Sequence, residues 1–306
     1  MSSLAAGALQ VAGVALAPLL PGTIQTLKAR LQGRRGTSPL QPYRVLRRLW
    51  RKSAVDPEGT GLVYRLAPPL AAGCLLIALV LVPLGGRSGD WSLGNDALVL
   101  VGLLALARFA VAAAAWDTAN GFALMGVARD LTIAVFGEAL LVLALLVAAL
   151  PADSTDLVTM SAAAHGADIW REPAHWCGAL AFALVVLVET GRQPIDNPDT
   201  HLELTMIHEG PLLEYAGRDL AYLHWAAAAR HWLVLVLTCE LFLPHWGGFG
   251  ARLALLGGGL LVLCAALAAT ETAQAKMRIL RVPALLGVGG LIALVGVGSW
   301  IAGGGS

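Results

Sequence analysis

Apolar runs long enough to cross a lipid bilayer recur along the whole chain. An α-helix needs about 20 mostly apolar residues to span the hydrocarbon core of a membrane. The pattern predicts eight such spans, at about residues 4–20, 66–84, 97–115, 131–150, 174–190, 222–243, 252–270 and 284–302. We therefore expect an all-α fold, a polytopic integral membrane protein with short amphipathic helices in its connections. Residues 1–306 are expected to form a single membrane domain.

The polar connections between these runs differ in charge. Of the 21 Lys and Arg residues, 16 fall in four connections, at about 21–65, 116–130, 190–221 and 271–283. Lys and Arg concentrate in the cytoplasmic loops of membrane proteins. The pattern thus predicts that these four connections are cytoplasmic and that both termini face the opposite side of the membrane.

The composition narrows the class of protein further. Hydrophobic residues make up 57% of the chain and charged residues 13%, whereas soluble domains average about 25% charged residues. This excludes a disordered chain and argues against a large soluble enzyme. A net charge of +1 gives no overall field for nucleic acid, so we expect no nucleic-acid partner. Each of the four cysteines stands alone in an apolar run, and no metal site is predicted from their spacing.

The first basic connection contains an amphipathic segment. Leu40, Tyr43, Leu46 and Trp50 recur at helical spacing, and the positions between them are mostly basic. Such a sequence is typical of a helix that lies on the membrane surface. Attraction to anionic lipid and docking of a protein partner both explain it.

Ionisable residues within the spans are candidates for function, because a charge in the bilayer is costly. Glu138 lies in the fourth span, where packing does not require a carboxylate. A proton relay is favoured over a purely structural hydrogen bond. Arg108 is a weaker candidate that we expect to pair with a carboxylate, and Glu240 is expected to reach water near the outer end of its span. Glu189 is expected to close the fifth span at the cytoplasmic face.

The connection between the fifth and sixth spans is unusually acidic. Its carboxylates are Glu189, Asp196, Asp199, Glu203, Glu209, Glu214 and Asp219. Thr200 to Glu203 form a capping box, which predicts the start of a helix. Carboxylates that lie close together have raised, coupled pKa values, as proton transfer requires. A solvated acidic surface is the alternative. His201 and His208 share a helical face but give only a weak metal signal.

Three strings in the sequence carry a resemblance to a known family. They are ETGRQPID at 189–196, HLELTMIHE at 201–209 and ETAQAKMR at 271–278. Together with the order of the spans, they resemble the membrane subunits of group 4 membrane-bound nickel–iron hydrogenases, of the formate hydrogenlyase and hydrogenase-4 type. That family is homologous to NADH dehydrogenase subunit 1, a membrane component of the NADH:quinone oxidoreductase, complex I. The first loop departs from complex I at Gly36 to Pro39, which weakens a quinone chamber.

The resemblance assigns roles to particular residues. It implies a proton relay through Glu138, Glu189, Asp196, Glu203, Glu209, Glu214 and His224. His224 stands where a carboxylate is common in the family. Supporting charges are expected at Arg129, Arg192 and Arg218. A docking surface for a peripheral module is expected at Arg34, Arg35, Arg44, Arg47, Arg48, Lys276 and Arg278. No residue of this chain is expected to be catalytic in itself.

The resemblance also implies cofactors and partners. The chain would anchor an oxidoreductase complex in a prokaryotic plasma membrane and bind no redox cofactor of its own. The nickel–iron centre and iron–sulfur clusters would belong to a large and a small partner subunit, and antiporter-like membrane subunits and lipid would be neighbours. Two other functions remain open at this point: a quinone-site subunit of an NADH:quinone oxidoreductase, and a structural anchor without a proton role. The electron donor and acceptor, and the choice of proton or sodium, depend on the partners.

Overall fold

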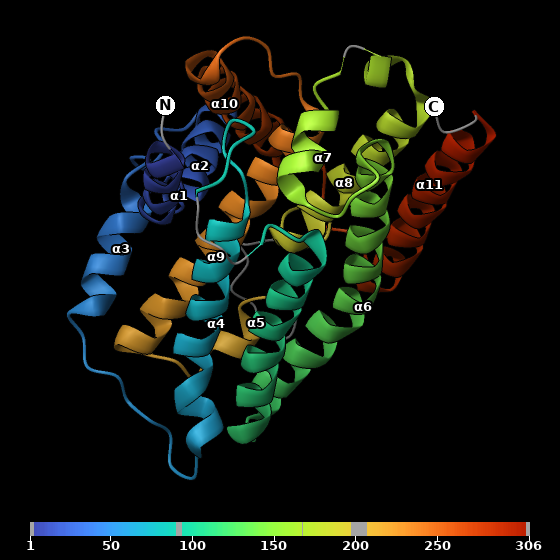
Figure 1. Cartoon of the computed structure of the whole chain (residues 1–306). Coiled ribbons are helices and arrows are strands. Elements are labelled where there is room, and N and C mark those ends of the chain that lie inside the picture. Colours follow the sequence, from blue (N-terminus) through green and yellow to red (C-terminus); the bar gives the residue numbers. More distant parts are fainter. Residues whose placement is uncertain (1–2, 90–93, 167, 197–206, 304–306) are drawn as a thin grey trace.

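The computed structural model describes residues 3–89, 94–166, 168–196 and 207–303. Over these ranges the chain forms a bundle of α-helices joined by loops and short 3-10 turns (Figure 1). The helices are α1 (Ser3–Leu16), α2 (Leu19–Leu31), α3 (Gln41–Trp50), α4 (Leu62–Leu81), α5 (Ala97–Asp117), α6 (Gly121–Ala149), α7 (Leu157–Ala163), α8 (Pro173–Glu189), α9 (Gly217–Phe242), α10 (Phe249–Ala273) and α11 (Val282–Ala302). The all-α, polytopic membrane fold is confirmed.

The predicted spans correspond to helices of unequal length. In the described residues, six helices are long and apolar enough to cross a membrane: α4, α5, α6, α9, α10 and α11. The helices α1 and α2, bent by 51° at their junction, make a seventh span if they are counted as one. The remaining apolar helix, α8, has 17 residues, which corresponds to a length of about 26 Å. The early end of α8 shapes the interior of the bundle.

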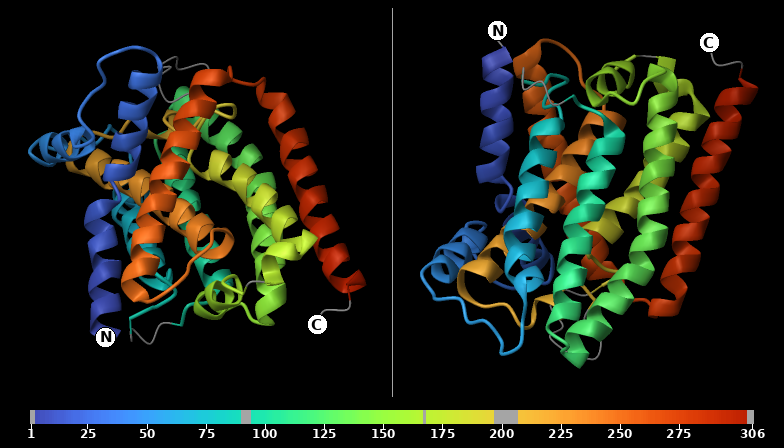
Figure 2. Two further views of the ribbon diagram at one scale, coloured as in Figure 1. Left: turned by 90° about the horizontal axis from the view of Figure 1, so that it is seen from above. Right: turned by 60° about the horizontal axis from the view of Figure 1, so that its bottom comes forward.

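The two ends of the bundle differ. Both termini lie at one end, and α3 with the loop that follows it lies toward the other (Figure 2). We call these the opposite end and the basic end. The surface helix predicted around residues 40–52 is α3, in which no residue is buried. The connection expected at 116–130 is much shorter, since α5 ends at Asp117 and α6 begins at Gly121.

The chain after α8 runs through the interior of the bundle. Glu189, the last residue of α8, contacts Arg108, which lies nine residues before the end of α5, or about 14 Å along its axis. Residues 191–196 are all buried. The expectation that Glu189 closes its span at the membrane face was wrong, because α8 ends early. The loop after it brings polar groups between α5, α6 and α9.

Candidate functional site: a buried ion network

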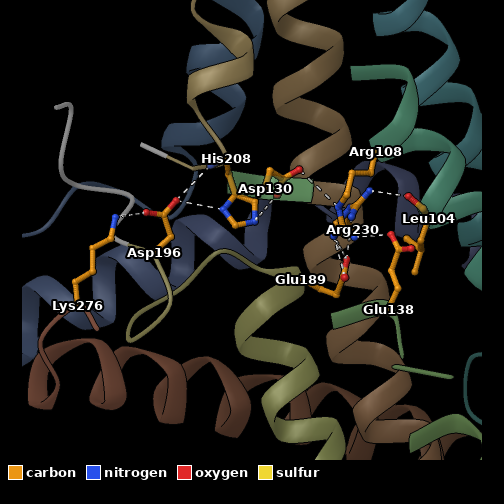
Figure 3. Close-up of polar contacts among 9 residues, drawn as sticks. All are labelled: Leu104, Arg108, Asp130, Glu138, Glu189, Asp196, His208, Arg230 and Lys276. Carbon is orange, nitrogen blue, oxygen red and sulfur yellow. Dashed lines mark hydrogen bonds and ion pairs between the residues drawn. The ribbon is translucent and has the colours of Figure 1, made fainter. Parts of the chain in front are cut away.

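Arg108 is the centre of a buried ion network. Its side chain is 7% exposed. Nη1 donates to Oε1 of Glu138 at 2.6 Å, and Nη2 donates to both carboxylate oxygens of Glu189 at 2.9 and 3.0 Å. Nε lies 3.8 Å from Oδ2 of Asp130. One guanidinium group of α5 therefore contacts carboxylates from α6 and from the end of α8 (Figure 3).

A second arginine shares the buried carboxylate of Glu189. Arg230 on α9 donates from Nη1 to Oε2 of Glu189 at 2.8 Å and from Nη2 to the carbonyl oxygen of Leu104 at 3.1 Å. The side chain of Glu189 is 1% exposed. A buried charge is tolerated only with close, hydrogen-bonded partners. Two guanidinium groups supply them here and tie α5, α8 and α9 together.

A second branch leads from Asp130 toward the loop. His208 Nε2 lies 3.6 Å from Oδ1 of Asp130, and His208 Nδ1 lies 3.2 Å from Oδ2 of Asp196. Lys276 Nζ donates to Oδ1 of Asp196 at 2.7 Å. His208 thus bridges two carboxylates from different segments (Figure 3).

The contacts of this branch shift the pKa values of its members. Burial by itself raises the pKa of Asp196, but hydrogen bonds from His208 and Lys276 outweigh it and hold that pKa below its usual range. Burial lowers the pKa of His208, but the hydrogen bond to Asp196 and the charge of Asp130 outweigh it and raise that pKa above its usual value. The branch therefore favours a charged imidazolium between two carboxylates.

Gly191 allows the close approach of His208. Its φ of +59° belongs to the left-handed region, and a Cβ at this position would lie 2.9 Å from His208 Nδ1. A side chain here would be both strained and in collision with the imidazole.

A third ion cluster lies beside the loop. Arg192 Nη1 donates to Oε1 of Glu271 at 2.8 Å, and Lys28 Nζ lies 3.0 Å from Oε2 of the same carboxylate. The side chain of Glu271 is 0% exposed. The cluster joins α2, the loop after α8 and the end of α10.

A cavity of about 430 Å³ opens between the network and the α2–α3 region. Its apolar lining includes Pro18, Pro21, Pro42, Leu46 and Leu75. Its polar lining includes Arg108, Glu189, Asp196 and His208. His231 also lines it, is 4% exposed, and has an Nε2 atom with no hydrogen-bond partner among the described residues. The cavity could hold an amphiphilic molecule with a polar group that meets an imidazole.

The structure places the predicted relay residues in different environments. Glu138, Glu189 and Asp196 belong to the network, and Glu209 and His224 line the cavity. Glu214 lies apart: Asn120 Nδ2 donates to its carboxylate, and Tyr64 donates to its backbone oxygen. Glu203, together with Asp199, His201 and the predicted capping box, lies outside the described residues.

The supporting and docking residues also divide. Arg192 is buried against Glu271, Arg129 lies within α6, and Arg218 is exposed at the start of α9. Most of the docking residues are exposed, namely Arg34, Arg35, Arg44, Arg47, Arg48 and Arg278. Lys276 instead binds Asp196 within the molecule.

Sequence reasoning missed several members of the network. It placed Arg108 among the weaker candidates, although the expected pairing with a carboxylate is confirmed. It gave no role in the relay to Asp130, His208, Arg230, Lys28 or Glu271. The one available signal was the uninterrupted helical pattern from 121 to 149, which places Asp130 inside a helix rather than in a loop.

Glu240 does not reach water. It is 0% exposed and accepts hydrogen bonds from the backbone N–H groups of Gly85 and Gly86 and from the Ser161 hydroxyl, at 2.6, 3.0 and 2.9 Å. The prediction failed because the α4–α5 loop and α7 fold over this end of α9. Among the described residues, no group of three or more His, Cys, Asp or Glu side chains could hold a metal ion.

Comparison with known proteins places this geometry in a family. The sequence profile of the NADH dehydrogenase family matches residues 5–296. The chain belongs to the NADH dehydrogenase family. Hydrogenase-4 component C of Escherichia coli (strain K12) is 35% identical over 75% of this chain and 71% of its own length. Formate hydrogenlyase subunit 4 of the same organism is 32% identical over 83% of this chain and 80% of its own length.

More distant relatives give the same family. A membrane component of the NADH-quinone oxidoreductase of Cereibacter sphaeroides is 30% identical over 71% of this chain and 70% of its own length. A chain of the membrane-bound sulfane sulfur reductase, an archaeal respiratory membrane complex, has the same fold, with a TM-score of 0.83, 21% identity, and coverage of 96% of this chain and 97% of that chain. The resemblance noted in the sequence is confirmed, and this NADH dehydrogenase family member is a multi-pass membrane protein related to subunits of oxidoreductase complexes.

Proposed function

We propose that this chain is the membrane-anchoring and proton-coupling subunit of a respiratory, hydrogenase-type complex. The observation that carries the proposal is the continuous ion network from Glu138 through Arg108, Asp130 and His208 to Asp196. Buried ionisable groups in a membrane protein are costly and mark proton or ion pathways. The hydrogenase-4 and formate hydrogenlyase relatives favour this class of complex.

The network links proton transfer to charge through a shared guanidinium. His208 lies between Asp196 and Asp130, so its imidazolium can pass the Nε2 proton to Asp130, leaving a neutral imidazole and a neutral carboxyl group. Asp130 and Glu138 both face Arg108. Neutralising one carboxylate leaves more of the guanidinium charge for the other, because the two compete for the same partner. A charge change in a peripheral module near the loop would therefore be felt at Glu138.

Glu138 is the outlet of this network. Its side chain is 30% exposed, more than those of Arg108, Asp130 and Glu189, and it lies on a spanning helix with hydrocarbon around it. We infer that a polar group of an adjacent membrane subunit covers it in the complex. The exposed basic residues of α3 and of the first loop would hold the peripheral module that carries the nickel–iron centre and the iron–sulfur clusters.

The test uses the assembled complex in inverted membrane vesicles. Hydrogen evolution from a reduced viologen dye reports electron transfer, and a pH-sensitive dye in the lumen reports proton translocation. Glu138→Gln should lower translocation at least tenfold, with assembly intact. Asp168→Asn is the matched control, because Asp168 is 98% exposed near the opposite end.

Two outcomes would overturn the proposal. If Glu138→Gln left both hydrogen evolution and translocation at the level of the Asp168→Asn control, the network would not be a relay. If it changed assembly but never the ratio of protons to electrons, the chain would be a structural anchor.

A quinone site is a second candidate function, favoured by the cavity of about 430 Å³ with apolar walls and by the Nε2 atom of His231 that faces no partner among the described residues. An imidazole that donates to a quinone carbonyl, above an apolar slot for the tail, fits this lining. Titration of the purified complex with a short-chain quinone, followed by protein fluorescence, should then show saturable binding that His231→Leu weakens. No saturable binding would exclude this candidate.

A further inference from the structure

The segment that follows α10 holds the relay loop at three points. Arg192 binds Glu271, the carbonyl oxygen of Pro194 accepts from the backbone N–H of Met277 at 2.8 Å, and Asp196 binds Lys276. Two of these contacts are charge-assisted, which makes them stronger than neutral hydrogen bonds. The 271–277 segment therefore determines where the loop between Glu189 and Asp196 lies.

The charge of Glu271 is fully enclosed. Its side chain is 0% exposed, and its partners Lys28 and Arg192 are 11% and 7% exposed. Removing one partner of a buried ion pair leaves the remaining charge uncompensated. Without the Glu271 carboxylate, the positive charges of Lys28 and Arg192 would act on the rest of the loop through a medium of low dielectric constant.

We propose that Glu271 is a positioning residue for the proton relay, which fixes the loop through Arg192 and offsets the positive charge that the relay histidine would otherwise meet. The proposal rests on the function proposed above and extends it to residues outside the network of Arg108. Glu271 touches no reacting group and acts through Arg192, Lys28 and the loop that they hold.

The charged surroundings set the direction of the effect. His208 faces Asp196 of its own loop region, Asp130 of α6 and Arg108 of α5, with Glu209 next to it in sequence. Arg192 faces Glu271, His231 of α9 and Cys264 of α10. Loss of a negative charge at Glu271 makes it harder for His208 to hold its proton, and loss of a positive charge at Lys28 makes it easier.

The experiment is a pH profile of hydrogen evolution by the complete complex. The alkaline limb of the wild-type profile should reflect loss of the His208 proton. Glu271→Gln should move this limb to lower pH and Lys28→Met to higher pH, each by a few tenths of a unit to about one unit, as expected for one unit charge roughly 10 to 15 Å away. The double variant, which has the same sum of charges as the wild type, should return the limb to its original pH.

The outcomes separate this inference from the function on which it rests. A merely structural role of Glu271 would lower the rate at all pH values and leave the limb in place, or would leave the double variant as displaced as Glu271→Gln; either result overturns the inference. If Glu271→Gln fails to assemble, the opposite shift in Lys28→Met still decides. His208→Gln is the control for the relay: if it retains the wild-type limb, the proposed relay itself fails.

Discussion

Glu189 should contribute far more to stability than Glu138, although both bind Arg108. Glu189 is 1% exposed and compensates two arginines, whereas Glu138 is 30% exposed and can leave Arg108 to Glu189. Glu189→Gln removes the negative member of a buried group and should cost about 3–5 kcal/mol. Glu138→Gln breaks a partly exposed pair, for which the cost is about 1 kcal/mol or less.

The comparison is made by heating the purified complex in detergent and following release of this subunit. At roughly 2 °C per kcal/mol for a chain of this size, Glu189→Gln should lower the midpoint by about 6–10 °C and Glu138→Gln by about 2 °C or less. Because both substitutions replace a carboxylate with an amide of the same shape, each is the control for the other. Equal shifts would refute the view that burial and the second arginine decide the role of Glu189.

Three further predictions concern separate parts of the molecule. Since the pKa of His208 is raised by folding, its stabilising contribution is full below about pH 6.5 and is lost as the pH rises through the raised value; the thermal midpoint should fall over that window, and His208→Gln should remove the fall. Gly191→Ala should destabilise the chain by about 1–2 kcal/mol for the left-handed backbone alone, and it should weaken the same pH step by displacing the imidazole; an unchanged step would contradict the packing described. Glu240→Gln should cost about 1–3 kcal/mol, because the amide N–H₂ group meets the N–H donors of Gly85 and Gly86, while the pH step stays intact; a stability equal to that of the wild type would mean that Glu240 does not hold that loop.

The sequence predicted the helices because the cause is local. A long apolar run in lipid must satisfy its own backbone hydrogen bonds, and only a helix does so within one segment. The same local pattern predicted α3, whose amphipathic spacing matches its place on the surface. The family resemblance lay in contiguous strings, and the similarity to known proteins confirms it.

The site depended on features that no local pattern encodes. The acidic loop was predicted, and Glu138 was selected from its cost in the membrane, but their connection through Arg108 was not. Arg108 meets Glu189 across 81 positions of sequence and Glu138 across 30. Helical periodicity fixes which residues share a face of one helix, but it carries no information about the depth at which two helices meet.

The length of α8 decided the rest. Its apolar run predicted a span that reaches the membrane face, but the helix ends at Glu189 beside the middle of α5. The loop after it then lies inside the bundle, where Arg192 and Asp196 find Glu271 and Lys276 from the far end of the chain. The sequence alone determined which residues are apolar, helical and acidic. Only the tertiary structure decided which charges are neighbours, because a buried charge is stable solely where distant segments bring its partner within hydrogen-bond distance.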